Sequence, residues 1–506
     1  MSRVVVVGAG LGGLAAAARL AATGHEVTVV EAADEVGGKL GTRRRDGFTF
    51  DTGPSLLTMP HVFRELFEDT GGPLEEVLEL ERLDVACRYR FPDGTGLEVP
   101  GRVEDVPAAL DAALGGGAGA QWSGFLRRAE QVWDVTHGPF LESPLGLPDL
   151  ARLSRRLGDV RTVAPWSSLR ALGRRHLTDP RLRQLLDRYA TYTGSDPRLA
   201  PAALATVPWV EQAYGSWHVV GGLHRLARAV ADRAVERGAR LLTSEPVVEV
   251  MTDAGRACGV RTATGRRLRA DVVVADADAA ELYDHLVTGP GVARARRRLA
   301  RTTPSLSGFV MLLALDDVPH PPAHHRVLFA EDYDAEFDAV FGRRRPPGPV
   351  PRPTVYVAAP EDPAMHPAGT ARGWFVLVNA PRHDPEVGVD WDEPGLAERY
   401  ADDVLAVMAD RGFDVRPQVR WRELLTPADL ARRTRTPGGS IYGSSSNGAR
   451  AAFLRPANRS PVPGLFLVGG SAHPGGGLPL VTLSARIVAD LVGPAVVRPG
   501  ARQDAR

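Results

Sequence analysis

The first 31 residues read MSRVVVVGAGLGGLAAAARLAATGHEVTVVE (residues 1–31) and contain a strand–turn–helix–strand pattern. Arg3 to Val7 is a short β-branched run of the kind found in buried parallel strands. The alanine- and leucine-rich segment from Leu14 to Ala22 predicts a helix that ends at Gly24. A second β-branched run from Glu26 to Val30 predicts another strand, which closes on Glu31. The amino end of the chain is therefore expected to form a βαβ-type unit.

The turn between the first strand and the helix has the spacing G-x-G-x-x-G, made by Gly8, Gly10 and Gly13. Such glycines allow a tight turn, a close approach of the backbone to a pyrophosphate, and close packing of helix on strand. The helix amino end adds free N–H groups and a positive dipole. Glu31 follows the first glycine by roughly 20 residues, the spacing of an acid that binds a ribose hydroxyl and disfavours a 2′-phosphate. We therefore predict a Rossmann-like dinucleotide site that does not take NADP.

The composition limits the other possibilities. Of the 506 residues, 44% are hydrophobic and 24% are charged, and the formal net charge is zero. This predicts two or three globular lobes and no general attraction for nucleic acid. The two cysteines, Cys87 and Cys258, are far apart, which excludes a disulfide framework and a cysteine metal site and fits a reducing cytoplasm. We expect no metal, and no further stretch is long and apolar enough for a spanning helix.

Two segments extend the predicted site beyond Glu31. Paired glycines at 37 and 38 precede Lys39, the one lysine of the chain, and a strand from Phe48 to Asp51 leads into Gly53, Pro54 and Ser55. Further on, residues 221–275 predict a helix after a glycine pair, strands near 240–243 and 247–251, a hairpin, and a last strand from Val272 to Ala275. A cofactor domain of this type is expected to be assembled from such distant segments.

Near the carboxy end the chain reads GGSAHPGGGLPL (residues 469–480), between a strand at 465–468 and a helix from near Leu480 to Leu491. Glycine and proline make such a run costly unless something requires a bare backbone. A helix amino end preceded by glycines is again a site for an anion or a dipole. We expect a ligand ring to lie against this segment, and the alternative is a structural turn with His473 fully satisfied.

Several motifs together resemble the bacterial carotenoid desaturases, the phytoene desaturase family of FAD-dependent oxidoreductases. The resemblance covers nearly the whole chain, through GAGLGGLAAAARL, EVGGK, FDTGPSLL, RYATYTGSDP (188–197), GGSIYGSS (438–445), RPANRS (455–460) and GLFLVGGSAHPGGGLPL. Gly476 departs from the family pattern, where a small side chain such as alanine is usual. The RYATYTGSDP segment and the HPGGGLP variant are similar to members that act on oxygenated or partly desaturated carotenoids.

The resemblance implies an α/β fold with a Rossmann-like FAD-binding domain of the glutathione-reductase and amine-oxidase type. It implies a discontinuous FAD-binding domain (1–75, 215–290 and 430–506), a mixed-sheet substrate lobe (76–120 and 291–429) and a helical, membrane-facing lobe (121–214). Strands of the substrate lobe are expected at 305–316, 353–360 and 373–381. The implied FAD contacts are Gly8, Gly10, Leu11, Gly12, Gly13, Glu31, Gly38, Lys39, Gly53, Pro54, Ser55, Val247, Val248, Gly469, Gly470, Gly477, Leu478, Pro479 and Leu480.

The resemblance also implies the reaction, a desaturation in which an allylic C–H of a long apolar polyene gives a hydride to flavin N5. A delocalised polyene cation needs no strong base, and His473 is either a proton acceptor or a structural residue. Quinone or oxygen is the expected electron acceptor. Two alternatives stay open: another flavin oxidase on the same fold, acting on an amine or a porphyrinogen-like ring, and a redox-neutral isoprenoid isomerase.

The segment 151–190 carries ten arginines against three aspartates, with leucines and Trp166 between them. A basic amphipathic region with a tryptophan is typical of a helix that lies on anionic lipid. We expect a cytoplasmic protein bound peripherally to an anionic membrane surface, while an arginine-rich solvated face is the simpler reading. Nucleic acid is not expected, because no set of stacking aromatic residues accompanies the arginines. The ten arginines are Arg152, Arg155, Arg156, Arg161, Arg170, Arg174, Arg175, Arg181, Arg183 and Arg188.

Overall fold

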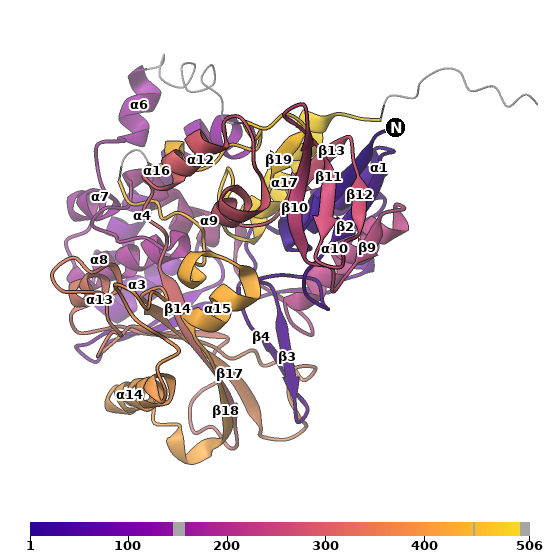
Figure 1. Cartoon of the computed structure of the whole chain (residues 1–506). Coiled ribbons are helices and arrows are strands. Elements are labelled where there is room, and N and C mark those ends of the chain that lie inside the picture. Colours follow the sequence, from indigo (N-terminus) through magenta and orange to yellow (C-terminus); the bar gives the residue numbers. More distant parts are fainter. Residues whose placement is uncertain (145–156, 449–450, 496–506) are drawn as a thin grey trace, which may run out of the picture.

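A five-stranded parallel sheet forms the centre of the upper right part of Figure 1. The computed structural model describes residues 1–144, 157–448 and 451–495. The strand order is β19-β13-β1-β2-β9, and all four pairings are parallel. The carboxyl ends of the strands therefore meet at one edge, where an open α/β sheet binds its ligand. The strands are β1 (Arg3–Val7), β2 (Glu26–Val30), β9 (Arg240–Leu242), β13 (Val272–Ala275) and β19 (Leu465–Leu467).

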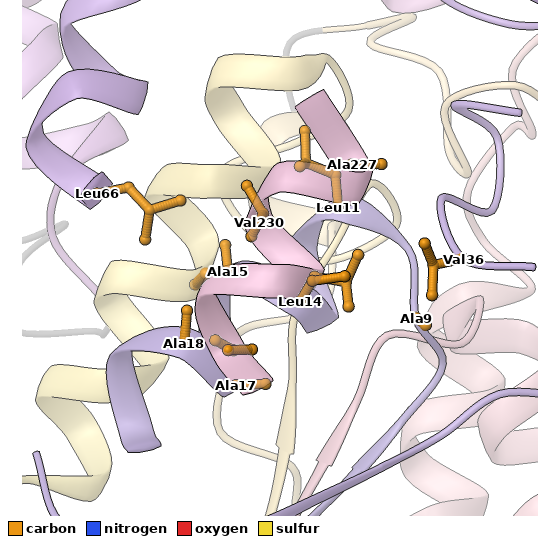
Figure 2. Packing of buried hydrophobic residues seen from close by; sticks show 14 of the residues in the cluster. Ala9, Leu11, Leu14, Ala15, Ala17, Ala18, Val36, Leu66, Ala227 and Val230 are labelled. Carbon is orange, nitrogen blue, oxygen red and sulfur yellow. The ribbon is translucent and has the colours of Figure 1, made fainter. Parts of the chain in front are cut away.

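Helix α1 (Leu11–Ala22) follows β1 and is buried along almost its whole length. Its small alanine side chains allow close packing with α10 (His224–Glu236), α17 (Leu478–Val492) and α2 (Pro60–Thr70). Figure 2 shows Leu14 and Ala15 of α1 among Leu66 of α2 and Ala227 and Val230 of α10. Helices from three distant parts of the chain thus enclose the helix whose amino end carries the glycine turn.

A three-stranded antiparallel sheet lies beside the parallel sheet, with the order β10-β11-β12. It contains β10 (Val247–Asp253), β11 (Arg256–Thr262) and β12 (Arg267–Arg269), and the turn at Gly265 confirms the predicted hairpin. The segments α11 (Ala279–Glu281), η5 (Leu282–Leu286) and α12 (Val292–Leu299) follow β13.

A seven-stranded mixed sheet occupies the lower part of Figure 1, in the order β18-β14-β17-β16-β15-β6-β7. The strands predicted at 305–316, 353–360 and 373–381 are confirmed as β14, β16 and β17, whereas β15 and β18 were not predicted. Helix α14 (Leu396–Asp410) packs against one face of the sheet. The strands are β6 (Val85–Arg90), β7 (Gly96–Pro100), β14 (Ser307–Leu315), β15 (His325–Leu328), β16 (Val355–Ala358), β17 (Arg372–Ala380) and β18 (Val419–Leu425).

The strand predicted at Phe48–Asp51 is present, but it packs against the large sheet and not against the parallel sheet. It forms β4, which pairs antiparallel with β3 (Thr42–Arg45) and adds nothing to the parallel sheet. Phe48 and Phe50 pack against Val310 and Phe375 of the seven-stranded sheet. The hairpin lies within the segment assigned to cofactor binding, yet its apolar face is buried on the substrate-lobe sheet.

The remaining helices gather at the left of Figure 1, and most of them share a core with β6, β7 and β15. They are α3 (Val106–Leu114), α4 (Ala118–Thr136), α6 (Leu157–Val163), α7 (Leu169–His176), α8 (Pro180–Arg188), α9 (Thr206–Tyr214) and α13 (Tyr333–Phe341). Shorter elements connect the lobes: η1 (Leu74–Glu76), η2 (His137–Leu141), η3 (Tyr189–Thr193), η4 (Ala202–Ala205), η6 (Arg416–Gln418), α15 (Pro427–Thr434), η7 (Pro437–Gly439), α16 (Ala451–Leu454), and the pair β5 (Leu80–Arg82) and β8 (Trp217–Val219).

The arginine-rich segment is less of a basic surface than its sequence suggests. Arg152, Arg155 and Arg156 lie outside the described residues. Arg170 forms ion pairs with Asp187 and Asp334, and Arg188 is buried. Within residues 157–190 the exposed arginines are Arg161, Arg174 and Arg175. In the described ranges, none of the helices is long and apolar enough to cross a membrane.

Candidate functional site: a dinucleotide cradle

The glycine turn after β1 leaves the amino end of α1 open to a ligand. Gly8 has φ +97°, which other residues rarely adopt, and its N–H donates to the Val30 carbonyl at 2.8 Å. Gly10 caps α1 without any side-chain hydrogen bond, and the first turn, from Leu11 through Gly12 and Gly13, carries no acid. The N–H groups of that turn, of which that of Gly13 also faces the Asp276 carboxylate, are the donors that a pyrophosphate takes at a helix amino end.

Glu31 stands at the end of β2, beside the glycine turn. Its carboxylate accepts the backbone N–H of Ala9 at 2.6 Å and of Ala33 at 2.8 Å. Its own carbonyl accepts the N–H of Glu245 at 2.8 Å, so the start of β10 lies next to it. Val247 is buried and Val248 falls at a shift of the β10–β11 register, which leaves Val248 without a cross-strand partner there. The acid and the backbone expected for the adenine half are thus brought together.

Asp276, which the sequence did not single out as a site residue, lies where the glycine-rich segments meet. It follows β13, and its half-buried side chain lies in the space that side chains at Gly10, Gly12, Gly13 and Gly469 would need. Burial raises its pKa to about 7, the nearby Glu31 charge adds to this, and the N–H groups of Gly13 and Gly10 and the Lys39 charge oppose it. Its position after a parallel strand, on the same edge as Gly8, was the available signal.

We expect flavin binding to weaken as pH rises through 7, because the charged form of Asp276 repels a pyrophosphate at the α1 amino end. If only the protonated form binds well, the dissociation constant rises about fourfold from pH 6 to pH 7.5. Asp276→Asn keeps the shape and removes the charge, so its affinity should stay constant. Quenching of flavin fluorescence on titration into flavin-free protein measures both. A pH dependence of flavin affinity that is the same in Asp276→Asn and in the wild type would contradict this role. Lys39 is present in both proteins, so its titration does not account for a difference between them.

Lys39 joins the first glycine segment to the carboxy-terminal part. Its ammonium group donates to the Ser440 carbonyl at 3.1 Å and the Ile441 carbonyl at 2.6 Å. Burial lowers its pKa to about 8, against the opposing charges of Asp278 and Asp276. A side chain at Gly38 would lie 3.3 Å from the Cα of Gly10.

Gly53, Pro54 and Ser55 continue from this point toward the seven-stranded sheet. A side chain at Gly53 would collide with the Lys39 carbonyl, so glycine is required there. The Ser55 hydroxyl lies 2.7 Å from that of Tyr356, and the Ser55 carbonyl lies 3.0 Å from Nε2 of His325. This segment therefore connects the cradle to the face of the large sheet.

The carboxy-terminal glycine segment meets the first one at Asp276 and ends at α17. A side chain at Gly12 would lie 3.0 Å from the Cα of Gly469. Gly477 caps α17 without a side-chain hydrogen bond, and a Cβ there would meet no atom within 4 Å. The helix begins at Leu478, two residues before the predicted start near Leu480, because Pro479 is well tolerated in a first turn. Gly470 is held through its carbonyl, which accepts from Arg455 at 2.6 Å.

Gly476 does not stand where the sequence interpretation placed it. We expected Gly475 to Gly477 to lie together against a flavin ring. A Cβ on Gly476 would instead lie 2.8 Å from the Tyr442 ring. Tyr442 belongs to the segment held by Lys39 and Arg455. The bare backbone at Gly476 is thus explained by another part of the chain, and Gly477 alone of the three faces open space.

His473 is enclosed between the glycine segment and the helical lobe. Its side chain is 1% exposed, and Nε2 lies 3.0 Å from the Ser143 carbonyl, which can only accept, so Nε2 carries the proton. The Phe140 ring packs edge-on at 5.2 Å. Burial lowers the pKa of His473 to about 4, and Nδ1 has no hydrogen-bond partner in the part of the chain that is described. These contacts fix the position of two lobes and leave a weak base.

The residues fit a flavin dinucleotide on the chain's own geometry. The amino ends of α1 and α17 carry no side-chain cap, and their glycine segments meet where Gly12 approaches Gly469. The Glu31 carboxylate stands beside the first of these ends, and β10 with its register shift at Val248 follows it. Gly477 leaves room where a ring system needs a bare backbone. The fold and the site define a protein of the dinucleotide-binding α/β class.

The family model of flavin-containing amine oxidoreductases matches residues 11–375. The chain belongs to this family of flavin-dependent oxidoreductases. A 4,4'-diapolycopene oxygenase of Methylomonas sp is 35% identical over 498 residues, covering 97% of this chain and 98% of that protein. A hydroxyneurosporene desaturase of Rubrivivax gelatinosus is 35% identical over 496 residues, covering 96% and 92%. A 1-hydroxycarotenoid 3,4-desaturase of a Flavobacterium sp. is 31% identical over 501 residues, covering 97% and 99%.

Solved structures share the fold. Putrescine oxidase bound to putrescine is similar with a TM-score of 0.65 at 17% identity, covering 97% of this chain and 99% of that one. An oxidoreductase from Methanosarcina mazei has a TM-score of 0.62 at 17% identity, covering 97% and 100%.

Proposed function

We propose that this protein is an FAD-dependent desaturase of a carotenoid or a related polyene isoprenoid. The observation that carries the proposal is the full-length similarity, at 31–35% identity, to enzymes named for desaturating hydroxylated carotenoids. FAD is favoured over FMN because the cradle has two parts. One is the phosphate and ribose site at α1 and Glu31, and the other is a ring site at α17.

A bound flavin would supply the acceptor for a hydride from an allylic C–H, and a proton would leave the adjacent carbon. The two hydrogens lost, one as hydride and one as proton, leave a new double bond. The chain orients the flavin through the α1 and α17 amino ends and Glu31. Lys39 and Arg455 hold the segment from Ser440 to Ser444 against the glycine turn. His473 stays neutral above pH 5 and is a poor proton acceptor at its lowered pKa. Quinone or oxygen would take the electrons in the second half of the cycle.

Because one of the relatives is named an oxygenase, the chemical identity of the product must be determined in addition to the rate of turnover. Co-expression with pathways that make carotenoids of different saturation and end group, followed by pigment analysis, tests the proposal. The expected product has two hydrogens fewer per step and no added oxygen. Products that gain oxygen, or unchanged pigments beside an amine-dependent reduction of the flavin, would overturn it.

We propose further that the protein binds an anionic membrane surface through the helical lobe. Such binding would give the protein access to an apolar polyene dissolved in the membrane. Trp166 is 67% exposed, and α6 projects from this lobe in Figure 1. Arg161 of α6, which precedes Trp166 in the same segment, is also exposed. On a membrane, Trp166 would enter the interface and the arginine would remain at the headgroups.

Flotation with vesicles containing anionic lipid tests this surface. Trp166→Ser combined with Arg161→Glu should reduce binding, and binding of the wild type should weaken with salt. Arg228→Glu, an exposed charge reversal on α10, is the matched control. Equal flotation with neutral vesicles, or an unaffected double variant, would count against this surface.

A further inference from the structure

Arg188, the last residue of α8, is buried in a cage of tyrosines at the junction of the helical lobe and the large sheet. Arg188 is only 8% exposed. Its guanidinium carbon lies 5.2–5.8 Å from the centres of four rings, within the range of a cation–π contact. The rings belong to Tyr89, Tyr189, Tyr192 and Tyr356.

Most of the hydrogen-bond donors of this guanidinium have no partner in the protein. Within the described ranges, its one side-chain hydrogen bond runs from Nη1 to the Tyr89 hydroxyl at 3.2 Å. The nearby carboxylate of Glu211 is taken by the hydroxyls of Tyr189 at 2.7 Å and Tyr192 at 2.6 Å. Nε and Nη2 donate to no described residue, although the surrounding protein does not enclose them completely.

The cage is connected to the flavin cradle on two sides. The Tyr356 hydroxyl lies 2.7 Å from that of Ser55, which follows Gly53 and Pro54. Tyr442 packs on Gly476 next to the α17 amino end, and its raised pKa is opposed by the charge of Arg188, so the two side chains lie within electrostatic reach. The cage of Arg188 therefore lies between the ring site and the large sheet.

A hydrocarbon gives such donors nothing to bind. Water can reach these donors while the site is empty. An apolar chain that displaces this water would leave them unpaired at a cost, and an oxygen acceptor brought by the substrate removes that cost. Glu211 already supplies a compensating negative charge to the cage, so the missing partner is a neutral oxygen and not a carboxylate. The tyrosine rings provide apolar walls for the polyene on either side of it.

We propose that Arg188 binds a hydroxyl or carbonyl oxygen of the substrate and makes the protein selective for oxygenated polyenes. The inference rests on the proposed desaturase function and narrows its substrate class. A hydrogen bond between a charged donor and this oxygen corresponds to a preference of about 10- to 100-fold in kcat/KM over the same polyene without the oxygen.

The experiment measures the rate of flavin reduction in the holoenzyme with two matched polyenes, one with a terminal hydroxyl and one without. The wild type should prefer the hydroxylated polyene. Arg188→Met, similar in length but apolar, should lose the preference by gaining activity on the hydrocarbon. Arg188→Lys, which keeps the charge with fewer donors, should fall between them. Equal kcat/KM for the two polyenes in the wild type would overturn the inference, whether or not the variants fold.

An unchanged preference in a folded Arg188→Met protein would also overturn it, and would assign the cage a purely structural role. Reduction of the flavin by neither polyene would instead refute the desaturase function itself. Tyr333→Phe is a control variant, since its buried hydroxyl has no hydrogen-bond partner in the described structure and lies outside the cage. Its preference should match that of the wild type.

Discussion

Gly10→Val is expected to abolish flavin binding while leaving most of the fold in place. The new side chain would run into the Asp276 carboxylate and occupy the space that a pyrophosphate needs at the α1 amino end. Overpacking of this kind costs about 1–3 kcal/mol, and a lost phosphate contact adds to it, so flavin affinity should fall by about 100-fold or more. Absorbance of the purified protein and thermal unfolding give the two readouts. Gly116→Val, at an exposed glycine with no neighbour within 4 Å, is the control.

A double variant separates the two reasons for glycine at this position. Gly10→Ala alone places a Cβ against Asp276, and Asp276→Ala removes that obstacle. If Gly10 serves the cofactor, the double variant should regain stability without regaining affinity for flavin. Recovery of full flavin binding in the double variant would show that Gly10 only accommodates Asp276.

His473→Ala is expected to lower stability strongly without changing how the reaction depends on pH. The variant loses a buried ring that contacts Phe140 and donates to Ser143, and removal of a buried ring typically costs about 3–5 kcal/mol. Flavin retention should fall with stability, because the same segment leads into α17. Urea unfolding and the flavin content of the folded fraction measure this. A protein of normal stability that retains flavin but turns over 10²–10⁴-fold more slowly would show that His473 is a proton acceptor.

The pH dependence of stability provides an independent check on His473. Its pKa is about 4 in the folded protein against 6.5 ordinarily, so protons bind the unfolded chain more tightly. The free energy of unfolding should therefore decrease as pH falls from 6.5 to 4, by about 3 kcal/mol from this residue. His473→Ala should remove that part of the decrease, and His285→Ala, at an exposed histidine, should not.

The sequence predicts the cofactor half of the fold well because its signals are local. The bounds of β1, β2 and β13 agree with the structure, since each is a short β-branched run bounded by glycine or a polar residue. β15 was missed because it is four residues long and lies in a stretch rich in proline and histidine. β18 was missed because its arginines and acid hide any alternation of apolar residues.

The parts of the site that were not predicted depend on contacts between distant residues. Asp276 becomes a site residue only because β13 pairs with β1, and Gly476 meets Tyr442 only after the lobes assemble. The basic surface predicted at 151–190 is reduced because Arg170 finds Asp334, 164 residues away. Charge and hydropathy along one segment contain no information about such partners.

Anaerobic mixing of the flavin-loaded protein with a carotenoid substrate tests the proposed chemistry most directly. A desaturase should bleach the oxidised flavin in a single turnover, with one new double bond in the polyene for each flavin reduced. Admission of oxygen or a quinone should then restore the flavin spectrum. Conversion of the polyene that needs flavin reduced beforehand and leaves its redox state unchanged would identify an isomerase and contradict the account.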